Sequence, residues 1–314
     1  MNLYKKSISY IYYNLKHRIQ TSTNVNNRKK YAGHYLLDKE NYNHLLYEFI
    51  VSGRPFMVAR YGTVELNCCK AFEFGLKHTY TGNMACMAKQ AGFFPIIPEA
   101  GLHFTELMKE ASLSVDILGT QFIRMEEYFI RHFMNKDVLL INQRELEPFI
   151  YPLHPWTSAL EGKKVLIIHP FTATIQEQYT KRKDLFPTIN ILPEFQLKTI
   201  KAVNTLQGKS EEYDTWFDAL KSMYQQAIDT DFDIAILGCG AYGFPLAAML
   251  KKAGKQAIHL GGATQALFGI RCKRFDEAPD YGYIRKYYNE AWSYAKPEET
   301  PIGASKVEGG AYWK

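Results

Sequence analysis

The turn Gly238-Cys239-Gly240-Ala241-Tyr242-Gly243 is the stretch of this sequence whose residue types and spacing point most directly to a binding site. It follows the apolar run Ile234 to Leu237 and precedes an apolar segment that ends at Gly254, so it joins a predicted strand to a predicted helix. Glycine permits tight backbone curvature and close approach of a ligand, and the N–H groups at a helix start can hold phosphate. The turn predicts a wall of a small-molecule site, although glycines used only to pack a helix on a strand are a competing explanation. The predicted contacts are Gly238, Gly240, Ala241, Tyr242 and Gly243.

A dinucleotide in this turn would make a further demand on the sequence. An Asp or Glu about twenty residues further on, at the end of the next strand, would have to bind the ribose hydroxyls. That strand ends at Leu260, and no acid follows before Asp276. We therefore expect no NAD cofactor, and a dinucleotide-dependent oxidoreductase remains the alternative enzyme class.

A second group of residues with chemical potential runs from Arg60 to Glu65 and follows another apolar run. The Arg60 guanidinium can form a paired hydrogen bond to a phosphate or a carboxylate. Glu65 can bind a divalent metal or act as a base. A structural ion pair between Arg60 and Glu65 explains the two side chains equally well, so both explanations stay open at this point.

Polar residues follow two further predicted strands. His169 ends one of them and can contact a diphosphate or exchange a proton, but a histidine in this position is often simply hydrogen-bonded. Gly261, Gly262 and Gln265 follow another and suit hydrogen bonds to sugar hydroxyls or to a base edge, with an ordinary turn as the alternative. Asp116 is the one acid of an apolar stretch, which makes it either a cap or a site carboxylate.

The elements that must position these residues alternate between short apolar runs and amphipathic helices, of which Tyr213 to Ala227 is the clearest. This alternation implies parallel strands joined by right-handed crossovers. We therefore predict an α/β, Rossmann-like, doubly wound and mostly parallel sheet with helices on both faces. Ligands of such sheets bind beyond the carboxyl ends of the strands, where the polar residues named above fall. The predicted strands are Phe56 to Arg60, Val138 to Asn142, Val165 to His169, Ile234 to Gly238 and Ala257 to Leu260, with Ile189 to Leu192 as a weaker sixth.

The net charge of +6 is concentrated in a basic N-terminal arm. Residues 1–30 contain seven Lys and Arg and no acid, so the remaining chain is close to neutral and offers no basic face for nucleic acid. Apolar residues recur in the arm at helical spacing, which suits either peripheral contact of residues 1–20 with an anionic membrane or docking of the apolar stripe on the domain. Polar residues interrupt every apolar run, so we expect a cytoplasmic protein without a secretory signal or a spanning helix. The apolar residues of the arm are Leu3, Tyr4, Ile8, Ile11, Tyr12, Leu15 and Ile19.

The chain divides into three predicted regions. Residues 1–30 form the arm, residues 31–275 form an α/β catalytic domain, and residues 276–314 form an aromatic-rich segment that packs on that domain because free tails are seldom so apolar. The five cysteines form no CxxC pair and no zinc-like spacing with histidine, so we expect them to be reduced and mainly packed in the core.

Two of these segments together resemble a known family. Residues 59–65 resemble the RFGDGE-type motif of the GT-D-fold glycosyltransferases of bacterial polysaccharide and glycoprotein glycosylation, with Thr63 in place of the first acid. Residues 233–262 are similar to the late strand, glycine turn, helix and following strand of that family. The resemblance spans roughly residues 50–270, and Val307 to Trp313 resembles the VEGGxYW-like tail of a related group of polysaccharide-biosynthesis proteins.

The resemblance implies a glycosyltransferase that moves a sugar from a nucleotide sugar, typically a UDP-sugar, to a glycan or lipid-linked glycan in bacterial surface polysaccharide biosynthesis. In the family two carboxylates hold a metal, so Glu65 would be left alone as the ligand of Mn²⁺ or Mg²⁺ or as a base. Arg60 or His169 would instead balance the charge of the leaving diphosphate. The alternatives are the oxidoreductase and a non-catalytic member of the fold that binds glycan or nucleotide. The implied donor contacts are Tyr61, Gly62, Thr63, the glycine turn, Gly261, Gly262 and Gln265.

Overall fold

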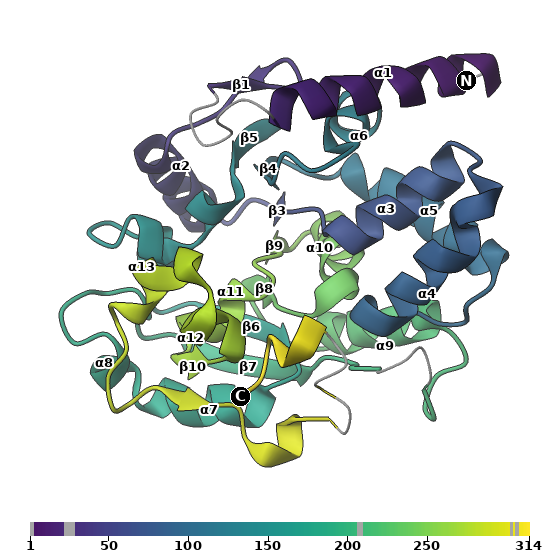
Figure 1. The fold of residues 1–314 in the computed structure, drawn as a ribbon. Coiled ribbons are helices and arrows are strands. Elements are labelled where there is room, and N and C mark those ends of the chain that lie inside the picture. Colours follow the sequence, from purple (N-terminus) through teal and green to yellow (C-terminus); the bar gives the residue numbers. More distant parts are fainter. Residues whose placement is uncertain (1–2, 22–28, 206–209, 302–303, 305–307) are drawn as a thin grey trace.

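A seven-stranded sheet forms the centre of the protein (Figure 1). The computed structural model describes residues 3–21, 29–205, 210–301, 304 and 308–314. The strand order is β5-β4-β3-β9-β8-β6-β7, and every neighbouring pair in this sheet is parallel. The strands are β3 (Phe56–Ala59), β4 (Ile117–Thr120), β5 (Leu139–Asn142), β6 (Lys164–His169), β7 (Gln196–Lys201), β8 (Ile234–Leu237) and β9 (Gln256–Ile258).

Helices cover both faces of this sheet and create two separate hydrophobic cores. The central strands have all their residues buried, as expected for parallel strands packed on both sides. This arrangement confirms the predicted doubly wound α/β fold. One face carries α3 (Thr63–Glu73), α4 (Tyr80–Ala91), α5 (Pro98–Ser112), α6 (Glu126–Phe133), α9 (Trp216–Ile228) and α10 (Gly243–Lys252). The other carries α2 (Lys39–Val51), α7 (Thr172–Thr180), α8 (Arg182–Leu185), α11 (Ala263–Leu267), α12 (Lys273–Glu277) and α13 (Gly282–Arg285).

For the seven-stranded sheet, the sequence prediction missed two strands, β4 and β7, and added a segment that is not a strand. Strand β7 lies at the sheet edge with alternating exposed residues, so it contains no apolar run. Strand β4 is short and contains Gly119, which weakens a strand pattern. The run Ile189 to Leu192 is loop, and its apolar residues Ile191 and Leu192 are buried because they fill the second core.

Asp116 lies at the amino end of β4, on the sheet edge opposite the strand ends where ligands of this fold bind. Its carboxylate accepts a hydrogen bond from the Met57 N–H at 2.8 Å and pairs with Lys251 Nζ at 2.7 Å. The structure therefore assigns Asp116 to a cap between two strands and a helix, and its prediction as a site carboxylate was wrong.

The helix predicted between Tyr213 and Ala227 is α9, which begins at Trp216. Thr215 and Asp218 form a capping box, in which the Thr215 hydroxyl accepts the Asp218 N–H and the Asp218 carboxylate accepts the Thr215 N–H. The cap explains why the helix starts there, while Tyr213 lies just outside it.

The two ends of the chain pack on different parts of the domain (Figure 1). The N-terminal helix α1 (Leu3–Thr21) is followed by the hairpin of β1 (Lys30–Tyr31) and β2 (His34–Tyr35). At the other end β11 (Ser293–Tyr294) pairs with β10 (Ile270–Arg271), and Trp292 and Trp313 are buried. Within the described residues, no helix combines the length and the apolar character needed to cross a bilayer.

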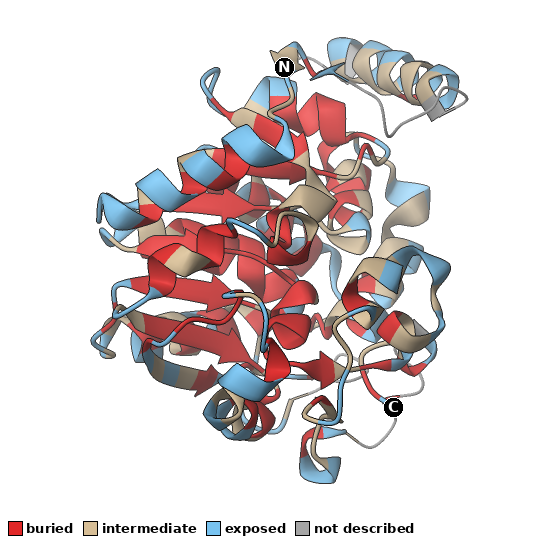
Figure 2. Cartoon of the chain, turned by 90° about the vertical axis from the view of Figure 1, so that its left-hand side faces the viewer, coloured by how far each residue is buried: buried red, intermediate tan, exposed pale blue. Residues whose placement is uncertain are grey.

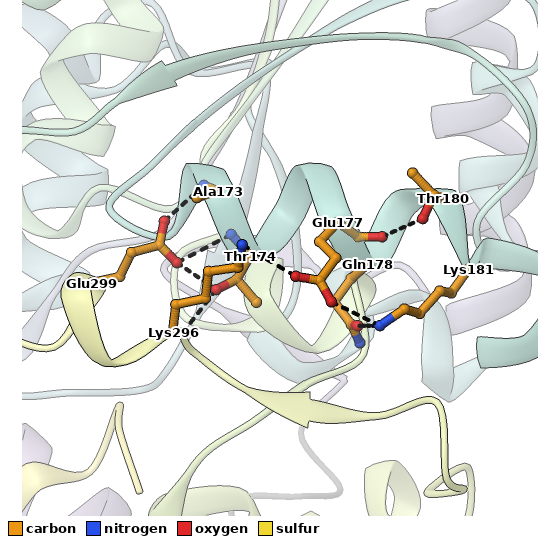
Figure 3. Close-up of polar contacts among 8 residues, drawn as sticks. All are labelled: Ala173, Thr174, Glu177, Gln178, Thr180, Lys181, Lys296 and Glu299. Atoms are coloured by element: carbon orange, nitrogen blue, oxygen red, sulfur yellow. Dashed lines mark hydrogen bonds and ion pairs between the residues drawn. The ribbon is translucent and has the colours of Figure 1, made fainter.

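Glu299 fastens the C-terminal segment to the start of α7 (Figure 3). Its carboxylate accepts hydrogen bonds from the Ala173 N–H at 2.7 Å, the Thr174 N–H at 3.1 Å and the Thr174 hydroxyl. The N–H groups at a helix start are otherwise unsatisfied, and a negative charge there is favourable. Lys296 adds an ion pair to Glu177 at 3.2 Å, so the segment is bound to α7 at two points.

Candidate functional site

A cleft of about 350 Å³ opens at the carboxyl ends of β3, β4, β6, β7, β8 and β9. Its walls are mostly the residues that directly follow these strands, because the carboxyl ends of parallel strands meet at one edge of a sheet. The cleft therefore collects residues from segments as distant in sequence as Arg60 and Trp313. The residues at the strand ends are Arg60, Gln121, His169, Pro170, Ala202, Gly238 and His259.

The cleft also lies where neighbouring strands send their chains to opposite faces of the sheet. After β6 the chain enters α7 on the second core, whereas after the adjacent β8 it enters α10 on the first. The same reversal separates β9, which leads to α11, from β3, which leads to α3. Such switch points leave a crevice between the diverging loops and are where doubly wound sheets bind ligands.

The glycines of the turn after β8 have different structural roles: two allow side chains to pack closely, and one leaves space for a ligand. A Cβ on Gly238 would lie 2.5 Å from the His169 ring and 2.8 Å from Thr264, so this glycine lets side chains pack beneath the turn. A Cβ on Gly243 would lie 2.3 Å from the His259 ring, and Gly243 is absent from the cleft wall. Gly240 has φ +57° with nothing within 4 Å of its Cβ position. Gly240 is thus the glycine that gives a ligand open space, and the predicted direct contact by Gly243 is corrected to a packing role.

Ala241 and Tyr242 are buried parts of the cleft wall. The Tyr242 ring stacks on Trp216 with the ring centres 4.4 Å apart and the planes 5° from parallel. The turn is therefore fixed from the side of α9.

The Arg60 side chain lines the cleft, and its charge acts on the buried Glu147 carboxylate from a distance. Its guanidinium carbon lies 3.2 Å from the position a Cβ would take on Gly261, which has φ +67°. Within the described part of the chain, no hydrogen bond or ion pair is made by this guanidinium. The predicted alternative, a structural ion pair between Arg60 and Glu65, is therefore not present, and the guanidinium is available to an anionic ligand.

Two buried histidines, His169 and His259, flank the turn after β8. Burial lowers the pKa of each imidazole to about 3, and Arg60 contributes to the lowering at His259. Nδ1 of His169 accepts the Phe171 N–H at 3.0 Å, which leaves its proton on Nε2. His169 is therefore a neutral hydrogen-bond donor, and the prediction that it balances diphosphate charge as a cation does not fit this environment.

Glu65 stands in the first turn of α3, with its carboxylate folded over Gly62. A Cβ on Gly62 would lie 1.9 Å from a Glu65 oxygen, so a larger residue there would displace the Glu65 carboxylate from this position. Thr63 is exposed at the cleft mouth, where the resembled family has an acid. No group of three or more His, Cys, Asp or Glu side chains lies within metal-binding reach among the described residues. The residues present thus do not fit a Mn²⁺ or Mg²⁺ site made by the protein.

Tyr61 was predicted as a donor contact but points into the core instead. It is fully buried, its hydroxyl lies 2.6 Å from the Ser112 hydroxyl, and its ring stacks on Phe244 with centres 4.7 Å apart. Its backbone carbonyl still matters for the cleft, because it accepts a hydrogen bond from Gln121 Nε2 at 2.5 Å.

The floor of the cleft contains buried polar atoms whose hydrogen-bonding capacity is not used within the described chain. They include Nε2 of Gln265 and Nδ1 of His259. A buried polar atom without a partner costs about 1–3 kcal/mol. Gln265 and His259 line the cleft, as do Gly261 and Gly262, so a polar ligand that reaches the floor can recover this cost with a small side-chain adjustment.

Sequence reasoning missed two parts of the cleft wall. The first part is Thr205, which follows the edge strand β7, a strand that was not predicted. The Thr205 hydroxyl donates a hydrogen bond to the carbonyl of Gly92, which directly follows α4, and Lys89 of α4 also lines the cleft. The second part is Arg274 and Tyr312, from the C-terminal part of the chain. The guanidinium carbon of Arg274 lies 4.4 Å from the centre of the Tyr312 ring. The aromatic density of the tail was a usable signal for this contact. Of the tail motif Val307 to Trp313, Val307 lies outside the described residues.

Comparison with known proteins gives distant structural similarity alone. A scan against protein-family models and a search of curated proteins find no match. A solved structure of the "highly conserved domain of unknown function 1792", described as having "a distinct glycosyltransferase fold", is similar over 82% of this chain and 96% of its own. It has 11% sequence identity and a TM-score of 0.37. A selenomethionine-substituted structure of the same domain has 13% identity and a TM-score of 0.35 over the same shares. Scores this low establish neither a family nor a function.

Proposed function

We propose that this protein is a glycosyltransferase whose cleft binds the diphosphate of a nucleotide sugar. The observation that carries the proposal is the Arg60 guanidinium, which lines a cleft at the switch points of the sheet and makes no hydrogen bond or ion pair with the described residues. A planar guanidinium matches two phosphate oxygens, and the open turn at Gly240 provides room beside it.

The charge balance of the cleft favours an anionic ligand. Arg60, Lys89 and Arg274 line it, whereas Glu65 is the one carboxylate among the described residues of its wall. Cationic side chains can stabilise the charge that develops on a leaving diphosphate. Because the carboxylates present do not form a metal site, this role falls to the basic side chains, with Arg60 as the principal one.

Sugar transfer in this cleft also needs a base for the acceptor and polar contacts to the donor, which Glu65 and the polar floor would provide. The acceptor hydroxyl would lose its proton to the Glu65 carboxylate as its oxygen bonds to the anomeric carbon. The bond from that carbon to the diphosphate oxygen would break, and the nucleoside diphosphate would leave. Gln265 and Gly262 would contact the sugar or the nucleoside, and neutral His169 would donate a hydrogen bond. A glycan or lipid-linked glycan of surface polysaccharide assembly is the proposed acceptor.

A dinucleotide-dependent oxidoreductase receives less support from the same cleft. The carboxylate that would bind ribose hydroxyls belongs at the end of β9, where His259 and Gly261 stand. Glu65 comes from the start of α3 instead.

The proposal is tested by incubating the protein with a panel of nucleotide sugars, with and without Mn²⁺, and measuring release of nucleoside diphosphate. NAD and NADP join the same panel in a thermal-shift assay. We expect one nucleotide sugar to stabilise the protein and to be consumed, and Glu65→Gln to bind it with little loss while turnover falls about a hundredfold or more. Stabilisation by NAD alone would support the oxidoreductase. Binding without turnover that is unchanged by Glu65→Gln would indicate a non-catalytic protein.

A further inference from the structure

Helix α1 presents a continuous apolar stripe to the solvent. Its five members are between 52% and 70% exposed, although each is a large hydrophobic residue. At 3.6 residues per turn they fall within about 100° of the helix circumference, which is one face. We call them the α1 stripe: Ile8, Ile11, Tyr12, Leu15 and Ile19. The side chains of Leu3 and Tyr4, predicted as part of the same stripe, lie outside the described residues.

The opposite face of α1 holds the helix on the domain, whose sheet and inner helices are buried (Figure 2). Lys6 pairs with Glu73 at 3.0 Å and Lys16 pairs with Glu127 at 2.5 Å, and both carboxylates are buried. Tyr13 packs edge-on against Tyr128 with ring centres 5.4 Å apart. The helix therefore docks through polar and aromatic contacts, which is the reverse of the predicted alternative in which the apolar stripe faces the domain.

The charge around the stripe indicates what covers it. Residues 1–30 contain seven Lys and Arg and no Asp or Glu. Lys5, Lys29 and Lys30 are exposed, and none of them forms an ion pair in the described part of the protein. A complementary partner must therefore be apolar beneath an anionic surface, which is the chemistry of an anionic phospholipid bilayer.

The docked helix lies at the edge of the sheet where the cleft opens. His17 Nε2 lies 3.1 Å from the Phe122 carbonyl oxygen, and Arg124 donates a hydrogen bond to the Asn14 side chain. Phe122 and Arg124 belong to the loop after β4, whose first residue, Gln121, lines the cleft. Contact of the stripe with a bilayer would therefore bring this edge of the sheet toward the lipid surface.

We propose that the α1 stripe inserts into the interface of an anionic phospholipid membrane and that the flanking lysines contact the lipid headgroups. This inference goes beyond the proposed function and does not depend on it, because the helix and its charges bind lipid whether or not the cleft transfers sugar.

Vesicle co-sedimentation tests the apolar part of this proposal. The full chain is mixed with vesicles of phosphatidylcholine and with vesicles that also contain phosphatidylglycerol, at low and at high salt. We expect clear binding to the anionic vesicles, and binding weaker by at least about tenfold for Ile11→Gln combined with Leu15→Gln. The matched control is Leu102→Gln with Leu113→Gln, which removes two apolar side chains of similar exposure from another part of the surface and should bind as the wild type does. All four sites are exposed, so unchanged unfolding temperatures confirm that the variants fold.

The electrostatic part is tested by Lys5→Gln, Lys29→Gln and Lys30→Gln in one chain. We expect this variant to lose most of the difference between anionic and neutral vesicles and to lose its sensitivity to salt. Equal binding of the wild type to both vesicle types, no binding to either, or unchanged binding of the Ile11 and Leu15 variant would overturn the proposal. So would analytical ultracentrifugation showing a wild-type dimer that the Ile11 and Leu15 variant cannot form, because the stripe would then bind a second copy.

Discussion

Gly243 illustrates how a single residue can shape the cleft without lining it. The missing side chain of Gly243 leaves the space in which the buried His259 ring lies, and His259 in turn lines the cleft. The turn after β8 can therefore approach the next strand closely, which keeps the carboxyl ends of β8 and β9 together at the site.

Replacing Gly243 with alanine should destabilise the protein. The new Cβ would lie 2.3 Å from the His259 ring, and overpacking of this kind costs about 1–3 kcal/mol. Gly82→Ala is the matched control, because Gly82 is an exposed helical glycine with nothing within 4 Å of its Cβ position. Alanine there should stabilise by about 0.5–1 kcal/mol. Urea unfolding measures the change in the free energy of unfolding for each variant. An equal change at the two sites would refute the packing role of Gly243.

His259 should also make stability depend on pH. Its pKa in the folded protein is about 3, below the usual 6.5, so between these values the unfolded chain binds a proton that the folded chain does not. The stability that this group contributes is complete above pH 6.5 and falls by about 1.4 kcal/mol per pH unit as the pH decreases toward 3.

The measurement is the difference in free energy of unfolding between wild type and His259→Gln at several pH values below 6.5. We expect the wild type to lose stability faster than the variant as the solution becomes more acidic. Glu126 acts in the opposite direction, because burial raises its pKa to about 7, but it is common to both proteins and cancels. Exposed His78→Gln should follow the wild type, and a constant difference for His259→Gln would show that His259 is protonated in the folded protein.

Residue types and spacing in the sequence were enough to identify many of the residues that line the cleft. Arg60, Glu65, Gly240 and Gln265 were found in the sequence because polar residues or glycines directly follow apolar runs, and the structure brings them to one cleft. The orientation of Tyr61 could not be found in this way, since it depends on packing against Phe244 from a distant helix.

At the scale of elements, the attachment of the C-terminal segment to α7 determines one wall of the cleft. Glu299 caps α7 through three hydrogen bonds, and Trp313 donates from Nε1 to the Glu299 carbonyl at 3.4 Å. Trp313 and Tyr312 line the cleft, so the cap and the wall are parts of one attachment.

Glu299→Gln should therefore weaken the attachment. The change removes a negative charge from the start of a helix and one or two charge-assisted hydrogen bonds, which together are worth about 1–2 kcal/mol. Glu298→Gln is the matched control, because Glu298 is an exposed acid directly before Glu299 in the sequence. Thermal unfolding should show a lower midpoint for Glu299→Gln alone, and hydrogen exchange should increase at the amides of Ala173 and Thr174. Equal midpoints for the two variants would show that the cap contributes little.

Strands whose residues are almost all buried and apolar could be predicted from the sequence, whereas the partly exposed strand β7 could not. Strands β3, β6 and β8 are continuous apolar runs because both of their faces are covered. Strand β7 carries polar residues on an edge, so its pattern does not differ from that of a loop. The residues after β7, including Thr205, were missed for the same reason.

At the scale of the whole molecule, the strand order brings loops from both halves of the chain to one cleft, and α1 lies beside α6 toward the β5 end of the sheet (Figure 1). The overall sheet followed from the alternation of runs and helices. The docking of α1 did not, because the sequence pattern of an amphipathic helix does not show which face meets the domain. Ion pairs to Glu73 and Glu127, which are distant in sequence, decided the orientation.

The central claim is that Arg60 makes this cleft a site for the diphosphate of a nucleotide sugar, and calorimetric titration tests it most directly. UDP and UDP-sugars are titrated into the wild type, Arg60→Lys, Arg60→Gln and the control Arg54→Gln, an exposed arginine at the other end of β3. We predict binding to the wild type and to Arg54→Gln, a loss of about tenfold to a hundredfold for Arg60→Gln, and an intermediate loss for Arg60→Lys because an ammonium cannot form the paired contact. Equal affinity of wild type and Arg60→Gln, or no binding of any nucleotide diphosphate to the wild type, would contradict the account.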